Sequence, residues 1–410
     1  MLARVVLRLF DESTPLLVRL PLRLLASLLP LAAAFADAPS APVRPAIQAA
    51  LAAQMEAGEI AGAVTLVVTR DAVLHHSANG LADRAVGRPM REDSVFWIAS
   101  MTKPITGAAI LLLQDEGKLR LDDPVAKHLP EFAALRTPAG RPANLTIAQV
   151  LTHTSGLGEA PGPAAEAART LADLVPAWLA APMQYEPGAR WKYSQSGINV
   201  AGRIVERISG MPFDEFLAGR LFGPLGMKDT TFFLEGDVRA RLVTAYEKNR
   251  QTGELRPVPP RAGYEGGRNR PPLPNGGLYS TGRDYARFCQ MLLGDGVFEG
   301  RRILSAAAVR ALRTPLTGDL PTGFFQSEAH GQYGRNYAWG PGTCILKEPH
   351  AGLAAMLSPG TFGHGGAWGT QAWIDPVKGV AYVLMVQRSN FPNSDASVVR
   401  LAFQQAAAAR

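Results

Sequence analysis

A serine and a lysine three residues apart, Ser100 and Lys103, are the residues whose types and spacing most directly suggest catalysis. They open residues 100–116, where an apolar run followed by Gly117 predicts a largely buried helix. Residues three apart share one helix face, so the lysine amine can reach the serine hydroxyl and act as its base. The helix N-terminus adds free N–H groups that can stabilise an oxyanion. The pair therefore predicts attack on a carbonyl, although S-x-x-K alone is often an exposed polar pair.

Two later segments carry groups that would complete such a site. Tyr193 precedes a predicted helix in WKYSQSG, where its phenol could point into a cleft and Lys103 could hold it partly as a phenolate, a general base. Residues 363–369, GHGGAWG, come just before a predicted strand. Their glycines would let the backbone approach a ligand closely, and the N–H of Ala367 could join that of Ser100 as an oxyanion donor. Each segment alone is more often ordinary structure: a buried tyrosine, or a bulge.

The three segments together, in this order, resemble the serine β-lactamase and penicillin-binding-protein superfamily. Within it they are most similar to the class C-like serine hydrolases and family VIII carboxylesterases. The family's S-x-x-K corresponds to residues 100–103, its Y-x-N to residues 193–195 and its K-T-G to residues 364–366. The resemblance runs from about residue 45 to the C-terminus, with supporting stretches at residues 96–103 (FWIASMTK), 150–157 (VLTHTSGL), 185–188 (YEPG), 224–227 (PLGM) and 276–281 (GGLYST).

This resemblance implies acyl transfer through a covalent acyl-enzyme, with no metal and no organic cofactor. Ser100 would attack, Lys103 and Tyr193 would shuttle its proton, and the N–H groups of Ser100 and Ala367 would form the oxyanion hole. The substrate-binding residues implied are Gln195, His364, Gly365, Gly366 and Trp368.

Two departures from the family pattern bear on the substrate. The family's β-lactamases use the lysine of K-T-G for the substrate carboxylate and the asparagine of Y-x-N for its amide, where this sequence has His364 and Gln195. Both departures favour an uncharged ester. Trp191, Trp368 and Tyr279 could add apolar walls, or be ordinary core residues. The first hypothesis is therefore a carboxylesterase acting on short acyl esters.

Two alternatives stay open. One is a β-lactamase, D,D-peptidase or D-aminopeptidase acting on cell-wall-type amides, so the expected partner is a small-molecule ester or amide. The other is a catalytically silent binding homologue, which the intact Ser100, Lys103 and Tyr193 speak against.

Three further histidines are expected to be non-catalytic. His153, in LTHTSGL, resembles a structural loop of the family, and His75 and His76 on a predicted hairpin strand are expected at the surface.

The predicted elements place strands at both ends of the chain and helices between them. This pattern favours an α/β (α+β) fold of β-lactamase type, with an antiparallel sheet flanked by helices, a mainly helical lobe, and the active site between them. The expected hydrolase domain spans residues 43–410, with a sheet lobe at about 43–115 and 275–410 and a helical lobe at about 116–274. The strand predictions are residues 63–68, 72–76, 337–344, 370–374 and 380–386.

Composition excludes several classes of protein. The 410 residues are 47% hydrophobic and 19% charged, which is typical of a globular chain. The net charge is +7, but the arginines are scattered and only Arg301 and Arg302 are adjacent, so no nucleic-acid surface is predicted. Cys289 and Cys344 lie too far apart for a C-x-x-C site, and nothing requires a disulfide between them.

The N-terminal segment, residues 1–38, has the organisation of a secretory signal. Arg19 and Arg23 precede an apolar stretch at residues 24–36 that is too short to span a bilayer and ends in small residues. We expect a cleaved signal and export, to the periplasm. An uncleaved anchor and a cytoplasmic protein with an apolar N-terminal helix are the alternatives, and no later stretch predicts a membrane span.

Overall fold

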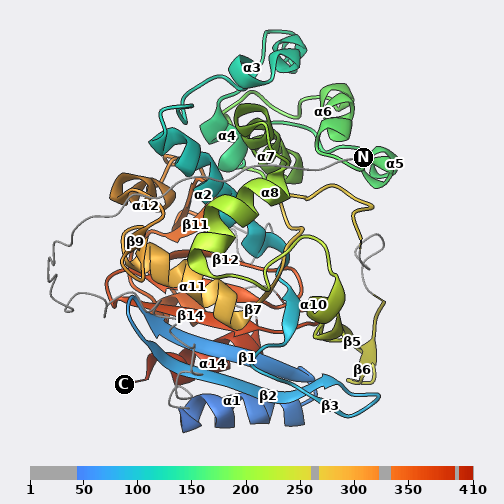
Figure 1. Ribbon diagram of the computed structural model, residues 1–410, viewed down its shortest axis with the longest axis vertical. Coiled ribbons are helices and arrows are strands. Elements are labelled where there is room, and N and C mark those ends of the chain that lie inside the picture. Colours follow the sequence, from blue (N-terminus) through green and yellow to red (C-terminus); the bar gives the residue numbers. More distant parts are fainter. Residues whose placement is uncertain (1–43, 260–266, 323–333, 393–396, 410) are drawn as a thin grey trace, which may run out of the picture. The chain divides into compact units, whose positions relative to one another are not determined.

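The computed structural model describes residues 44–259, 267–322, 334–392 and 397–409. The predicted leader at residues 1–38 lies outside them. Residues 41–410 form one compact unit (Figure 1). Within the described ranges, no helix combines the length and the apolar character needed to cross a membrane.

The helical segments alternate with short loops through the middle of the chain. The α-helices are α1 (Pro45–Glu56), α2 (Thr102–Asp115), α3 (Val125–His128), α4 (Ile147–Leu151), α5 (Gly162–Ala167), α6 (Val175–Ala180), α7 (Gln195–Ser209), α8 (Phe213–Leu217), α9 (Gly223–Leu225), α10 (Gly236–Ala240), α11 (Gly282–Leu293), α12 (Ala306–Leu312) and α14 (Val398–Ala408). Short 3₁₀ segments are η1 (Ala99–Met101), η2 (Pro130–Ala134), η3 (Ala172–Leu174) and η5 (Gly352–Met356), and η4 (Ala218–Phe222) is a π-helical turn.

The strands come mainly from the two ends of the domain. They are β1 (Gly62–Thr69), β2 (Val73–Asp83), β3 (Arg88–Pro89), β4 (Val95–Trp97), β5 (Tyr246–Lys248), β6 (Leu255–Pro257), β7 (Tyr279–Thr281), β8 (Val297–Phe298), β9 (Arg301–Arg302), β10 (Tyr337–Gly340), β11 (Thr343–Leu346), β12 (Phe362–Gly365), β13 (Gln371–Asp375) and β14 (Val380–Met385).

One eight-stranded sheet organises the fold, in the order β10-β11-β12-β13-β14-β1-β2-β3. Its neighbours are antiparallel, and β1 pairs with β14 from Val64 opposite Met385 to Thr69 opposite Val380. The sheet therefore joins strands from both ends of the domain. This architecture confirms the predicted fold class, while the lobe boundaries near residues 115 and 275 stay a prediction.

Both faces of the sheet are buried. Along β1, Val64 and Leu66 belong to one apolar cluster, and Ala63 and Val67 belong to a second cluster on the opposite side. Side chains of a strand alternate between faces, so this division assigns one cluster to each face. The helix α11 covers the first face, and α1 and α14 pack together on the second (Figure 1).

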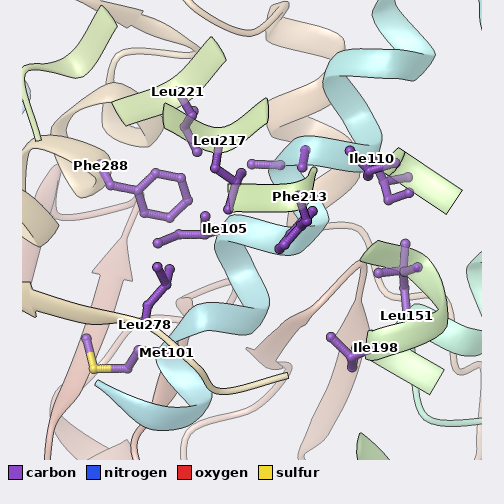
Figure 2. Close-up of a cluster of buried hydrophobic side chains, with 14 of the residues drawn as sticks. Met101, Ile105, Ile110, Leu151, Ile198, Phe213, Leu217, Leu221, Leu278 and Phe288 are labelled. Atoms are coloured by element: carbon purple, nitrogen blue, oxygen red, sulfur yellow. The ribbon is translucent and has the colours of Figure 1, made fainter. Parts of the chain in front are cut away.

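The helix α2 runs through the larger cluster. Every residue from Thr102 to Leu113 is buried, as the continuous apolar sequence predicts. Figure 2 shows Ile105 and Ile110 of this helix among side chains from α7, α8 and α11. Gly107 allows close contact with the β10–β11 turn, because a Cβ there would lie 2.0 Å from the carbonyl oxygen of Pro341. A helix fixed on all sides gives the residues at its N-terminus a rigid support.

Two predictions from the sequence were wrong. Residues 337–344 are not one strand but the hairpin β10–β11, which turns at Gly342 with a φ of +74°. His75 and His76 are buried rather than at the surface, with exposed fractions of 0% and 4%. Residues 363–369 do come just before a strand, β13, and the first of them belong to a further strand, β12, between β11 and β13.

The environment of His75 explains its burial. Its Nδ1 accepts a hydrogen bond from the N–H of Arg44, and its Nε2 lies 3.0 Å from the hydroxyl of Thr65. Burial lowers the pKa of both histidines to about 4, with Arg44 acting on His75 and Arg283 on His76. The side chain of Glu92 lies 3.3 Å from Nδ1 of His76. Both rings are therefore neutral at pH 7. Both cysteines, Cys289 and Cys344, are buried, and no disulfide joins them.

Candidate active site

Ser100 lies at the turn between strand β4 and helix α2. The two residues that flank it, Ala99 and Met101, are buried, whereas Ser100 is only half-buried. Ala99 has a φ of +45°, which is uncommon for a residue with a side chain and marks a sharp turn. The buried neighbours thus hold a serine hydroxyl at the accessible end of the central helix.

The amine of Lys103 lies beside that hydroxyl. Its Nζ is 3.1 Å from Oγ of Ser100, 3.1 Å from Oε1 of Gln195 and 2.5 Å from the carbonyl oxygen of Asn275. Lys103 is fully buried, and burial lowers its pKa well below the ordinary lysine value, although Glu159 raises it. A neutral amine has two N–H donors and one lone pair. The two carbonyl acceptors use the donors, so the lone pair is left for the proton of Ser100.

Tyr193 covers this amine from the loop before α7. The Nζ of Lys103 lies 4.7 Å from the centre of its ring, and its hydroxyl lies 3.3 Å from Nε2 of His364. Burial raises the pKa of Tyr193, while a hydrogen bond with the side chain of Ser100 lowers it. The phenolate expected from the sequence is therefore disfavoured, because a charge is costly in this desolvated place. The phenol keeps its proton, and the amine is the stronger candidate base.

His364 is fully buried on β12 and faces Tyr193. Its Nδ1 lies 2.6 Å from the carbonyl oxygen of Gly365, which can only accept, so Nδ1 carries the proton. Nε2 is then an acceptor for the phenol of Tyr193. Burial and the nearby Lys103 lower the pKa of His364 well below the ordinary histidine value. His364 therefore presents a neutral group at neutral pH in place of the family's K-T-G lysine, in keeping with the uncharged ester expected from the sequence.

An aromatic cluster supports Tyr193 from behind. The ring centres of His153 and Tyr193 are 4.5 Å apart, and Trp339 lies 4.6 Å from His153. Nδ1 of His153 accepts the backbone N–H of Ser194 at 3.1 Å, which fits the structural role expected for it. Trp191 is 8% exposed and packs on the same rings, so it is a core residue rather than a wall of the site.

The glycine-rich turn after β12 lies against the turn that carries Ser100. A Cβ at Gly366 would be 2.6 Å from the carbonyl oxygen of Ile98 and 2.0 Å from Oγ1 of Thr370. Glycine is thus required here because the chain's own atoms leave no room for a Cβ. Ala367 is exposed. The backbone N–H groups of Ser100 and Ala367 donate to no residue within the described ranges, so both are available to an oxyanion.

The site is also positioned by four residues that were not predicted from the sequence. Asn275 accepts from Lys103 and donates from Nδ2 to Gln195 at 2.7 Å, and Glu159 accepts the N–H groups of Gln195 and Ser196 at the start of α7. The Asn-Gly-Gly sequence at 275–277 was the available signal, since it predicts a turn. The buried guanidinium of Arg400 donates to the carbonyls of Gly366 and Thr370, and that of Arg270 donates to the carbonyl of Gly277.

The substrate-binding residues expected from the sequence divide into two groups. Gln195 contacts Lys103 directly, and Gly365 and Gly366 support the turn near Arg400. Trp368 instead lines a cavity of about 490 Å³ next to the site. In the described part of the chain, no group of three or more histidine, cysteine, aspartate or glutamate side chains could hold a metal ion.

Comparisons with known proteins agree with this geometry. The Beta-lactamase family model matches residues 47–407. Esterase EstB of Burkholderia gladioli is 32% identical over 351 residues, which are 80% of this chain and 86% of that protein. Penicillin-binding protein 4 of Amycolatopsis lactamdurans is 34% identical over 276 residues, 67% of this chain and 71% of its own. The solved structure of EstCE1, a hydrolase with promiscuous acyltransferase activity, superposes with a TM-score of 0.74 at 24% identity, covering 89% of this chain and 98% of that one.

Proposed function

Because the chain belongs to the β-lactamase family of serine hydrolases, we propose that it is a carboxylesterase that cleaves short acyl esters with Ser100 as nucleophile. The observation that carries the proposal is the 3.1 Å distance between the buried amine of Lys103 and the hydroxyl of Ser100. A neutral lysine amine at that distance is a base that can activate a serine hydroxyl at neutral pH.

In the first half-reaction, Lys103 takes the proton of Ser100 as Oγ forms a bond to the ester carbonyl carbon. The carbonyl oxygen becomes an oxyanion, which the N–H groups of Ser100 and Ala367 stabilise. The C–O bond to the alcohol then breaks. The proton on Lys103 passes to the leaving oxygen by way of the hydroxyl of Tyr193, so the alcohol leaves neutral and an acyl-serine remains.

In the second half-reaction, water attacks the acyl-serine. Lys103 accepts the water proton as the new C–O bond forms, and returns it to Oγ of Ser100 as the acyl bond breaks. The carboxylic acid leaves and the free enzyme is restored. These steps use only side chains and backbone N–H groups of this protein, without a metal or an organic cofactor.

The neutral His364, at the position of the family's K-T-G lysine, supports esters over β-lactams as substrates. His364 is neutral at pH 7, so it offers no cation to a substrate carboxylate, and the carbonyl oxygen of Gln195 is already used by Lys103 and Asn275. The name of esterase EstB agrees with this preference. The similarity to a penicillin-binding protein keeps cell-wall-type amides as the second candidate substrate class.

Hydrolysis of p-nitrophenyl butyrate, compared between wild type and Ser100→Ala, tests the proposal. We expect Ser100→Ala to lose activity by at least about 10³-fold, and the matched control Ser358→Ala to keep it. A fluorophosphonate adduct should be found by mass spectrometry on Ser100. Full activity of Ser100→Ala, or an adduct on another serine, would refute Ser100 as the nucleophile. Nitrocefin hydrolysis as fast as ester hydrolysis would favour cell-wall-type amides as the substrate class.

We also propose that the protein is exported with cleavage of its leader. The support is the sequence of residues 19–36, with its arginines, apolar stretch and small residues. N-terminal sequencing of protein isolated from periplasmic and cytoplasmic fractions tests this proposal. An intact N-terminus in the cytoplasm would contradict it.

A further inference from the structure

An apolar cavity of about 490 Å³ lies next to the oxyanion turn, and the steps proposed above do not use it. Two tryptophans form part of its wall, Trp97 and Trp368, with ring centres 4.7 Å apart. Trp97 lies three residues before Ser100, and Trp368 directly follows Ala367. The cavity therefore lies close to both N–H groups that would hold the oxyanion.

The wall of the cavity is rigid where it meets the site. The indole N–H of Trp97 donates to the carbonyl of Gly276 at 2.7 Å, and its backbone N–H donates to Oε1 of Gln387 at 3.0 Å. Ala99, Trp97 and Tyr279 belong to one buried apolar cluster. A preformed apolar cavity with fixed aromatic walls is suited to bind an apolar group without a cost of rearrangement.

The position of the proton donor decides which part of an ester would enter this cavity. In the tetrahedral intermediate, the oxyanion points to the N–H groups and the leaving oxygen must lie near Tyr193, which protonates it. Neither Tyr193 nor His364 lines the cavity. The remaining substituent on the reacting carbon is the acyl chain, so it is the part of the ester that is left to enter the cavity.

Among the polar side chains of the lining, Arg239 and Gln387 limit the chemistry of that acyl chain. Arg239, on α10, is the one charged residue among those that line the cavity, and it forms no ion pair with any described residue. Gln387 is 7% exposed, and its Nε2 has no hydrogen-bond acceptor in the described ranges. Both groups are donors, so the lining is complementary to an apolar body that carries acceptor oxygens.

We propose that this cavity is the acyl-binding site and that it selects esters of acids with an extended apolar chain ending in a second carboxylate. The apolar chain would lie against the wall that Trp97 and Trp368 form together, and the far carboxylate would meet Arg239. The inference rests on the proposed esterase function and goes beyond short acyl groups.

Three p-nitrophenyl esters test the inference: acetate, octanoate and hydrogen suberate, which is the octanoate chain with a carboxylate at its far end. We expect kcat/KM of wild type to rise from acetate to octanoate and again to hydrogen suberate. Arg239→Gln should lower the ratio of kcat/KM for hydrogen suberate to that for octanoate about tenfold, since an arginine–carboxylate hydrogen bond is lost. The matched control Arg207→Gln, an exposed arginine on α7, should leave that ratio unchanged.

A second variant tests the cavity itself. Val258→Trp fills it from a half-buried position on its wall, and should lower the ratio of kcat/KM for octanoate to that for acetate about tenfold. The control Val377→Trp, 72% exposed in the β13–β14 turn, should not. The inference would be overturned if wild type hydrolyses all three esters, Arg239→Gln leaves the hydrogen suberate to octanoate ratio unchanged, and Val258→Trp leaves the octanoate to acetate ratio unchanged. The proposed esterase function would then still stand. Hydrolysis of none of them by wild type would overturn the proposed function.

Discussion

The amine of Lys103 lies 2.5 Å from the carbonyl oxygen of Asn275, a residue 172 positions further along the chain. This contact joins the central helix to the loop before β7. It also gives the amine an acceptor that cannot donate in return, so one N–H of Lys103 always points away from Ser100. The orientation of the base thus depends on a backbone atom rather than on another titratable side chain.

Replacement of the base should be the most informative change at the site. We expect Lys103→Met to lower kcat for p-nitrophenyl butyrate by about 10²- to 10⁴-fold, the usual contribution of a general base, with a small change in KM. Lys228→Met, on an exposed lysine, is the control. A variant that keeps most of the wild-type kcat would show that another group activates Ser100.

The pH profile of kcat/KM provides a second measurement on the same residue. The neutral amine is the active form and its pKa is well below the ordinary lysine value, so wild-type activity should persist at neutral pH and fall as acid protonates Lys103. The acidic limb should disappear in the residual activity of Lys103→Met. Activity confined to pH values near the ordinary lysine pKa would contradict the burial argument.

Gly366→Ala should damage the oxyanion turn without touching Ser100 or Lys103. The added Cβ would lie 2.6 Å from the carbonyl oxygen of Ile98, a backbone atom that cannot move without moving η1. We expect kcat to fall at least about tenfold and the free energy of unfolding to fall by about 1–3 kcal/mol, as for other overpacked sites. Gly219→Ala, where an added Cβ meets nothing within 4 Å, is the control for both measurements.

Two buried histidines should make stability fall in mild acid. His75 and His76 have pKa values of about 4 in the folded protein against 6.5 as the reference, so the stability they contribute is present above pH 6.5 and is lost as the pH falls toward 4. Asp284 acts in the opposite direction, because burial raises its pKa to about 6 from 3.8. The two histidines together change the free energy of unfolding more than the one carboxyl group does, so the net effect of acid is a loss of stability.

Urea unfolding at pH 7 and pH 5 measures this effect. The free energy of unfolding should fall by about 2 kcal/mol or more between the two, with an unchanged m-value. His76→Gln should reduce the difference. Equal stability at the two pH values would show that the rings are charged or accessible in the folded protein.

Long apolar segments made much of the fold predictable, whereas short segments were predicted less well. The continuous apolar run after Ser100 predicted the buried helix α2, and the apolar segments at residues 63–68 and 72–76 predicted the β1–β2 hairpin. The β10–β11 hairpin was predicted as one strand because the residues on both sides of its short turn, Pro341–Gly342, are strand-like. The strand β12 was not among the predicted strands because its glycines are also common in loops, whereas here they allow backbones to approach closely.

The candidate site was predictable where its residues fall in one motif. Ser100 and Lys103 follow from helix periodicity. Asn275 and Arg400 do not, because they meet the site only through the fold. The Asn-Gly-Gly sequence predicts a turn but not its contact with Lys103, and Arg400 carries no local signal. The protonation of Tyr193 was predicted in the wrong direction, since it depends on which rings cover the phenol, and the covering residues come from distant segments.

The pairing of β1 with β14 also sets a requirement on the order of folding. Residues 62–69 stay without one of their two neighbouring strands until residues 380–385 have been synthesised, so the centre of the sheet forms last during translation. Contacts of such long sequence separation slow folding. A nascent chain truncated before β14 would expose a hydrophobic strand edge that is prone to aggregation, and only the nearly complete chain can protect it.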